Sequence, residues 1–148
     1  MERFLSRRWL LALGFCLATL GHAQTAPAPV LTAAESQSIR EVIRAQLDAF
    51  ASDDADRAFS YAAPNIRQTF RTAENFITMV KNGYPVVYRP ASVTFLRPRT
   101  FEGEVIQAVQ LSDDDGKIWL AFYKMQRLPD NTWRVNGCEL RRAEGSMT

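Results

Sequence analysis

The sequence predicts an α+β fold in which N-terminal helices pack on a strongly curved antiparallel β-sheet. Apolar side chains recur at helical spacing between residues 32 and 83. From residue 92 onward, β-branched and aromatic residues form segments that are typical of strands, and Gly, Pro, Asn and Asp residues separate them as hairpin turns would. The chain has 148 residues, of which 47% are hydrophobic, and this size suits one domain.

The chain begins with the three parts of a cleavable export signal. A basic start precedes an apolar run from Trp9 to Leu20, and the small residues Gly21 and Ala23 suit cleavage after Ala23. The apolar run is shorter than the roughly 20 residues that a membrane-spanning helix needs. We therefore expect a periplasmic or secreted protein with no stable membrane insertion after cleavage. The pair Arg7-Arg8 also fits the twin-arginine pattern, so ordinary secretory and twin-arginine export both remain open.

Removal of residues 1–23 changes the chemistry that is open to the mature chain. It takes away more basic than acidic residues, so the formal net charge falls from +2 to zero. It also removes His22, the single histidine, and Cys16, one of two cysteines. Without histidine, Ser-His-Asp and Cys-His catalysis and the usual zinc and non-haem iron sites lose an essential group. We therefore expect no metal and no cofactor, and zero net charge argues against a nucleic-acid partner.

The residues after the signal divide into a flexible leader over residues 24–31, a single α+β domain over residues 32–143 and a tail over residues 144–148. Thr32 and Glu35 fit a capping box at the start of the first helix. The apolar stripe of that helix is Ile39, Val42, Ile43, Leu47 and Phe50. Three further helix starts are expected at Ser52-Asp53-Asp54, Pro64 and Thr72, and Gly83 and Pro85 are expected to end the last helix.

Four strands are expected after these helices. Residues 100–103, 113–116 and 129–131 separate them as hairpin turns, and Asp115-Gly116 is the strongest turn signal. The predicted strands are Ser92–Arg99, Glu104–Ser112, Lys117–Leu128 and Thr132–Leu140.

Two stretches of the sequence resemble a known family. Residues 84–90 (YPVVYRP) and 133–140 (WRVNGCEL) are similar to a family of exported bacterial proteins called domain of unknown function 4864. The long first helix, the break at residues 50–59 and the terminal strands also resemble the nuclear-transport-factor-2-like (cystatin-like) superfamily. The resemblance covers residues 39–140 and implies a cone-shaped pocket between helices and sheet. It implies no activity, because that superfamily contains enzymes, ligand carriers and dimerisation modules.

Aromatic and polar residues of the later segments are the candidates for lining such a pocket. Clefts that bind apolar ligands are lined by aromatic side chains with a few placed polar groups. A packed core or a dimer interface would use the same aromatic residues. The candidate pocket-lining residues are Tyr61, Tyr84, Tyr88, Arg89, Trp119, Tyr123 and Cys138.

Charged residues offer few further sites. Residues 113–116 (DDDG) lack the alternate carboxylates of a calcium loop, and we interpret them as a solvated hairpin tip. Glu104 and Glu139 lie on predicted strands, where an outward side chain is the default. Arginines suit carboxylate or phosphate recognition, and three of them gather near the start of the predicted sheet: Arg89, Arg97 and Arg99.

Cys138, the cysteine of the mature chain, has two interpretations. A lone thiol in an oxidising compartment could form a mixed disulfide, pair with a second subunit or act as a redox-sensitive site. It could equally be a small packed residue of the last strand. Gly137 indicates a bulge, which would bring Cys138 and Leu140 to the same face as Trp133 and Val135.

Two functions from different classes fit these observations. The first is a non-catalytic module that binds a small apolar ligand or another protein. The alternative is a small lyase or isomerase acting on a hydrophobic carbonyl compound, with an inward carboxylate as base and a tyrosine as oxyanion donor. A carboxylate within hydrogen-bond reach of a pocket tyrosine would favour the enzyme, and its absence would favour the non-catalytic module. A third hypothesis is a homodimer whose aromatic sheet face is covered by its twin, and an exposed Trp119 in a monomer would argue against it.

Overall fold

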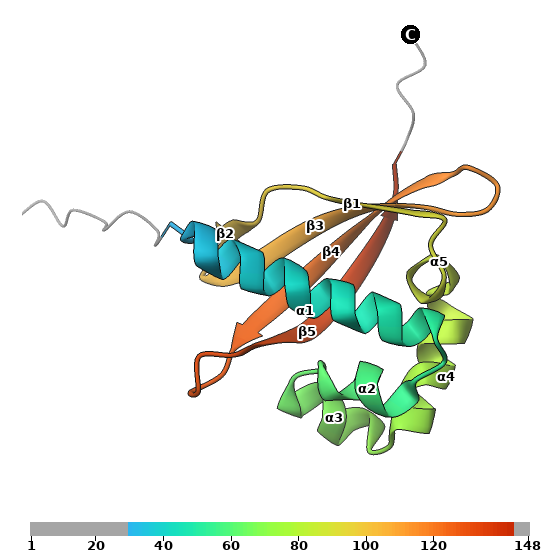
Figure 1. Cartoon of the computed structure of the whole chain (residues 1–148), viewed down its shortest axis with the longest axis horizontal. Coiled ribbons are helices and arrows are strands. Elements are labelled where there is room, and N and C mark those ends of the chain that lie inside the picture. Colours follow the sequence, from blue (N-terminus) through green and yellow to red (C-terminus); the bar gives the residue numbers. More distant parts are fainter. Residues whose placement is uncertain (1–29, 144–148) are drawn as a thin grey trace, which may run out of the picture.

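The computed structural model describes residues 30–143 and confirms the α+β fold class (Figure 1). The predicted signal peptide, most of the leader and the tail lie outside these residues. No helix of the described part is both long and apolar enough to cross a bilayer. The helices are α1 (Ala33–Ala51), α2 (Ala55–Ser60), α3 (Pro64–Phe70), α4 (Ala73–Gly83) and α5 (Pro85–Tyr88). The strands are β1 (Ser92–Phe95), β2 (Arg99–Phe101), β3 (Glu104–Ser112), β4 (Ile118–Arg127) and β5 (Trp133–Arg142).

Helix starts follow the local signals in the sequence. The Thr32 hydroxyl accepts a hydrogen bond from the backbone N–H of Glu35 at 3.1 Å, and the Glu35 carboxylate accepts one from the backbone N–H of Thr32 at 2.9 Å. Asp54 caps α2 and Thr72 caps α4 in the same manner. The predicted end of the helix at Gly83 is confirmed, and Pro85 also begins a short helix, α5, that was not expected from the sequence. The fixed φ and missing N–H of proline are compatible with a first helical position.

The sheet is antiparallel throughout, with the order β1-β3-β4-β5, and β2 pairs with the first part of β3. The predicted strand over residues 92–99 is therefore wrong in its extent, because the chain leaves the ladder between Phe95 and Arg99. Pro98 lies in this interruption and has no N–H to donate to a neighbouring strand. The turn into β3 shortens to Glu102-Gly103, with φ values of 49° and 80°, as a two-residue hairpin requires.

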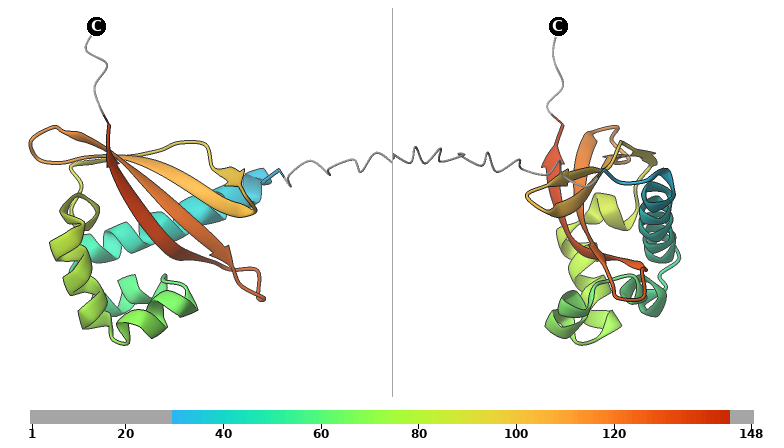
Figure 2. Two further views of the ribbon diagram at one scale, coloured as in Figure 1. Left: turned by 180° about the vertical axis from the view of Figure 1, so that it is seen from behind. Right: turned by 90° about the vertical axis from the view of Figure 1, so that its left-hand side faces the viewer.

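The helices cover one face of the sheet, and no helix of residues 30–143 lies on the opposite face (Figure 2). α1 runs along the inner face of the curved sheet and buries Ile39, Ile43 and Phe50. The inner face contributes alternate residues of the strands, including Val109 and Ala121, which are fully buried. The remaining helices pack near one end of α1, so the core continues between α4 and the strands.

β5 is an edge strand, and the connection between α2 and α3 pairs with it. The backbone N–H of Val135 donates to the carbonyl of Tyr61 at 2.8 Å, and the N–H of Ala63 donates to the carbonyl of Val135 at 2.9 Å. The predicted bulge is confirmed, because the β4–β5 register shifts between Lys124 and Met125, opposite Gly137. The bulge brings Cys138 to the inner face that Val135 also occupies.

A buried glutamine holds the interruption between β1 and β2. Gln107 is fully buried, and its amide Nε2 donates to the carbonyl oxygens of Leu96 at 2.7 Å and Ala108 at 2.8 Å. The backbone N–H of Leu96 also donates to the carbonyl of Ala108 at 3.0 Å. These bonds satisfy backbone groups that the interrupted ladder would leave unpaired.

Gln107→Leu is expected to destabilise the protein, because it leaves the Leu96 carbonyl without its side-chain donor. The expected loss is about 1–3 kcal/mol in the free energy of unfolding, measured by urea denaturation. Gln110→Leu on the opposite face of β3 is the matched control and should change stability by less than about 0.5 kcal/mol. Equal stability of the two variants would contradict this role for Gln107.

Asp113 organises the turn between β3 and β4, where residues 113–116 form the expected hairpin tip. One carboxylate oxygen accepts from the backbone N–H groups of Asp115 and Lys117, and the other accepts from the indole N–H of Trp119 at 3.0 Å. The Trp119 hydrogen bond, followed by the two backbone N–H groups, holds the pKa of Asp113 below its usual value of 3.8.

Asp113→Asn is expected to destabilise the protein near neutral pH but to matter little in strong acid. A carboxyl whose pKa is lower in the folded state contributes stability above its unfolded pKa and loses it as the pH falls through the folded value. Thermal unfolding midpoints at pH 7 and at pH 2 test this, with Asp114→Asn as the exposed control. If the variant lowers the unfolding midpoint as much at pH 2 as at pH 7, the ionised carboxylate of Asp113 is not the source of the stabilisation.

Candidate functional site

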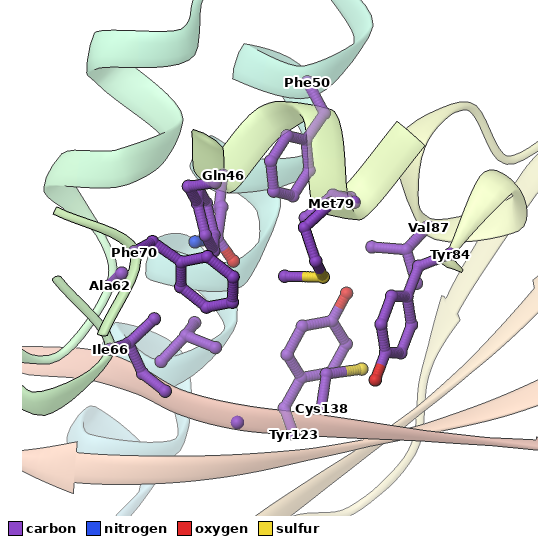
Figure 3. Close-up of a pocket in the computed structure, with 14 residues that line it drawn as sticks. Gln46, Phe50, Ala62, Ile66, Phe70, Met79, Tyr84, Val87, Tyr123 and Cys138 are labelled. Carbon is purple, nitrogen blue, oxygen red and sulfur yellow. The ribbon is translucent and has the colours of Figure 1, made fainter. Parts of the chain in front are cut away.

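A pocket of about 260 Å³ lies between the helices and the inner face of the sheet (Figure 3). Helices α1, α3, α4 and α5 supply one wall, and β4 and β5 supply the other. Half-buried side chains on α3 and α4 border the pocket, whereas the residues deeper inside are fully packed. The lining residues are Gln46, Phe50, Ala62, Ile66, Phe70, Phe76, Met79, Val80, Tyr84, Val87, Tyr123, Val135, Gly137 and Cys138.

The structure brings together three of the predicted pocket residues. Tyr123 and Cys138 are direct cross-strand neighbours in the β4–β5 register, and Tyr84 reaches the same pocket from the end of α4. Figure 3 shows their polar atoms on the side of the pocket that Met79 also borders. The sheet register and the β5 bulge therefore place a phenol and a thiol side by side on an apolar wall.

Four predicted pocket residues lie elsewhere. Tyr61 borders a separate surface hollow beside Trp133, because its backbone carbonyl is bound to β5. Tyr88 packs its ring against Phe50 with a centroid separation of 6.3 Å, and its hydroxyl is buried without a partner. The sequence indicated aromatic residues near the sheet, but it could not show which side of α5 they would occupy.

Arg89 and Trp119 lie together at a different hollow, beside the β3–β4 turn. Arg89 donates to Asp53 at 2.8 Å and thereby connects α5 to the turn after α1. Lys81 binds the same carboxylate at 3.1 Å, and these contacts lower the pKa of Asp53, with the Lys81 hydrogen bond as the largest cause. The expected cluster of Arg89 with Arg97 and Arg99 is wrong, because this ion pair holds Arg89 at the other end of the molecule.

Several lining residues were not predicted, because they belong to helices whose apolar stripes were interpreted only as core. Gln46 is the one that the sequence could have revealed. It interrupts the apolar stripe of α1 between Ile43 and Phe50, yet it is 2% exposed. Its Nε2 donates to the carbonyl of Ala58 at 3.0 Å, which leaves the amide oxygen on the pocket side of the residue.

Tyr123 is the most deeply buried polar residue of the pocket. Its side chain is 1% exposed, and its hydroxyl has no oxygen or nitrogen partner among the described residues; its polar neighbour is the thiol of Cys138, a weak acceptor. Burial raises the pKa of Tyr123 well above its usual value of 10.0, and the adjacent Cys138 raises it further. The phenol therefore stays protonated and remains a hydrogen-bond donor throughout the physiological range.

No carboxylate is present among the lining residues of this pocket. Glu104 and Glu139, the strand glutamates for which an outward side chain was the expectation, both face solvent. Glu104 pairs with Lys124 at 3.0 Å, and Glu139 pairs with Arg141 at 2.9 Å. In the described chain, no group of three or more potential metal-ligating side chains is found either.

The sequence of this chain matches a known family model, described as a domain of unknown function (DUF4864), over residues 32–148. The chain belongs to this family. The match includes both motifs that suggested it, at residues 84–90 and 133–140. No match was found among curated proteins. Since the DUF4864 family is defined without an activity, function has to be inferred from the pocket itself.

Cys138 is unpaired and half-buried, and it faces the pocket. Burial is the main cause that raises the pKa of its thiol to about 12, although the neighbouring Tyr123 hydroxyl lowers it in part. Only the thiolate form of a cysteine is reactive, and at neutral pH almost none of Cys138 is present as thiolate.

Iodoacetamide at pH 7.5 is therefore expected to modify Cys138 at least about tenfold more slowly in the folded protein than in urea. The rate in the folded protein should rise steeply with pH above 9, because the thiol ionises only in strong base. Intact-protein mass spectrometry over time measures both rates. Rapid modification of the folded protein would contradict the packed, protonated thiol and favour a redox-sensitive role.

Proposed function

We propose that this DUF4864 protein is an exported, non-catalytic module that binds a small, neutral, largely apolar ligand in the pocket. The N-terminal pattern of residues 1–23 supports export to the periplasm or secretion. A long helix along the inner face of a curved antiparallel sheet supports membership of the nuclear-transport-factor-2-like superfamily. The composition of the pocket wall supports ligand binding.

The observation that carries this proposal is the buried hydroxyl of Tyr123, which has no oxygen or nitrogen partner among the described residues and meets only the weakly accepting thiol of Cys138. A buried polar group without a hydrogen bond costs about 1–3 kcal/mol, so native proteins rarely retain one without a use. A ligand oxygen placed against Tyr123 would accept the missing bond. Met79 borders this hydroxyl, and its flexible, polarizable side chain can move to admit a ligand.

The size and charge of the pocket narrow the ligand class. A cavity of 150 Å³ holds benzene, so 260 Å³ accommodates a molecule of about ten non-hydrogen atoms. None of the lining side chains is Arg, Lys, Asp or Glu. A buried charge without a partner is strongly unfavourable. The proposed ligand is therefore a neutral apolar molecule with one hydrogen-bond acceptor, such as a ketone, aldehyde or ester.

The alternative of a lyase or isomerase receives no support from this pocket. Its mechanism needs a carboxylate base near the tyrosine, and the lining residues provide a phenol, a thiol and an amide instead. A tyrosine that can only donate a hydrogen bond is sufficient to orient a carbonyl group. It does not by itself supply the base that proton abstraction requires.

A homodimer is a second proposal, and the uncovered face of the sheet supports it. Half-buried apolar side chains project from this face, and the central ones are Ile106, Ala108, Leu120 and Phe122. Trp119 is on the inner-facing side of β4, with Ala121 and Tyr123, and its indole is bound to Asp113. The interface would therefore centre on Phe122 and would not use Trp119.

Native mass spectrometry of mature protein from Gln24 to Thr148, purified from the export compartment without refolding, tests both proposals. Extra mass that disappears on denaturation is expected from a retained ligand. A mass of two chains is expected from a homodimer. A bare monomer that also fails to bind any of the probes below would contradict both proposals.

Tyr123→Phe is expected to weaken binding of 2-octanone about tenfold, because it removes one hydrogen bond of about 1.4 kcal/mol. Binding of octane, which has no acceptor, should be unchanged. Tyr61→Phe, outside the pocket, is the matched control. Tryptophan and tyrosine fluorescence or calorimetric titration gives the dissociation constants. Octanoate that displaces 2-octanone from the protein at pH 7.5 as effectively as a second ketone does would contradict a neutral pocket.

A further inference from the structure

A second groove, separate from the pocket, lies between the beginning of α1 and the segment that joins β1 to β2. Its volume is about 590 Å³. Figures 1 and 2 show β2 beside the first turns of α1. Arg40 of α1 lines one side, and Arg97 and Arg99 line the other. Val30 and Leu31 add apolar surface to the groove.

Within residues 30–143, no carboxylate neutralises the three guanidinium groups. No carboxylate lines the groove, and the described chain shows no ion pair for Arg40, Arg97 or Arg99. Glu35, in the first turn of α1, is engaged elsewhere, because it binds Thr32 and pairs with Arg127 at 2.9 Å. The mature chain has no net charge, so three unneutralised cations in one groove are a local feature and not a consequence of composition.

Arg40 provides a second observation that points to a hydrogen-bond acceptor bound in the groove. Its Nε atom is buried and has no hydrogen-bond partner. Arginine has five N–H donors and no acceptor, and buried donors are normally satisfied by protein, water or ligand. The helix dipole adds partial positive charge at the beginning of α1, about two turns before Arg40.

The opposite wall of the groove is held rigidly. Gln107 binds the carbonyl of Leu96 at 2.7 Å, directly before Arg97. Arg99 is fixed by the β2–β3 register, where it lies opposite Ile106. Pro98 between the two arginines is buried. Because this backbone is held before any ligand arrives, binding would not have to order it, and preorganisation of this kind favours affinity.

We propose that this groove binds an organic oxyanion, a phosphate or carboxylate group carried on a short apolar chain. Guanidinium groups pair with both anions through two parallel hydrogen bonds. The exposed Val30 and the half-buried Leu31 would contact the chain. This site is independent of the proposed pocket, which has no charged lining residue, and the two sites would select ligands of opposite character.

Calorimetric titration of the mature protein at low salt tests the site with three probes of equal chain length: hexyl phosphate, hexanoate and 1-hexanol. The two anions should bind with one molecule per chain, and raised salt should weaken both because the contacts are charged. 1-Hexanol should not compete with either anion. The anion that binds more tightly identifies the headgroup, and comparison with inorganic phosphate measures the contribution of the chain.

The double variant Arg97→Gln/Arg99→Gln should weaken binding of the preferred anion at least about tenfold. Arg142→Gln removes the same kind of charge at the far end of β5 and is the matched control. Arg97 and Arg99 are exposed, so the double variant should keep the circular dichroism spectrum and unfolding midpoint of the wild type. Tyr123→Phe should leave anion binding unchanged, which separates this site from the pocket.

Several results would overturn the proposal. If no anion binds the wild type at low salt, the groove is not an anion site. If the double variant and Arg142→Gln lose affinity equally, the binding is general charge attraction. If the anions are displaced by 1-hexanol, or lost in Tyr123→Phe, they occupy the pocket and not the arginine groove.

Discussion

Backbone pairing between Val135 and the connection of α2 to α3 is the constraint on which the pocket depends. Two hydrogen bonds, to Tyr61 and from Ala63, attach this connection to the outer edge of β5. They satisfy an edge strand that would otherwise present unpaired groups. They also fix where α3 starts, so that Ile66 and Phe70 stand over the inner face of the sheet. The helices are thereby held above β4 and β5, and the space between them is the pocket.

The bulge at Gly137 determines the chemistry of that space. In a regular strand, inward and outward residues alternate, so the side of the sheet that Cys138 occupies depends on the register. The extra residue turns Cys138 inward beside Tyr123 and leaves Glu139 in solvent, paired with Arg141. A single irregularity thus places a neutral thiol and phenol in the pocket and excludes the carboxylate that an acid–base enzyme would need.

The two candidate sites differ in their electrostatics because they are built from different parts of the fold. The pocket lies within the core, where an unpaired charge would be strongly unfavourable, and its polar groups are uncharged. The groove of Arg40, Arg97 and Arg99 lies at the surface, where solvent reduces the repulsion between like charges. Gln107 supports the groove from inside the sheet, so a residue of the core positions the charges outside it.

Local signals were sufficient for most of the fold. The Thr32–Glu35 capping box, the caps at Asp54 and Thr72, the proline at position 64 and the turn at Asp115-Gly116 each act within a few residues, and the structure contains all of them. The class of the fold followed from the change of apolar period from residue 88 onward. Membership of the DUF4864 family was likewise recognisable from two short motifs.

Contacts between distant segments could not be predicted from such local signals. These contacts are the ion pair of Arg89 with Asp53, the break in the ladder before Arg99, and the meeting of Gln46, Tyr84, Tyr123 and Cys138 at one pocket. Each requires chain segments that are far apart in sequence, and only their packing in three dimensions brings them together.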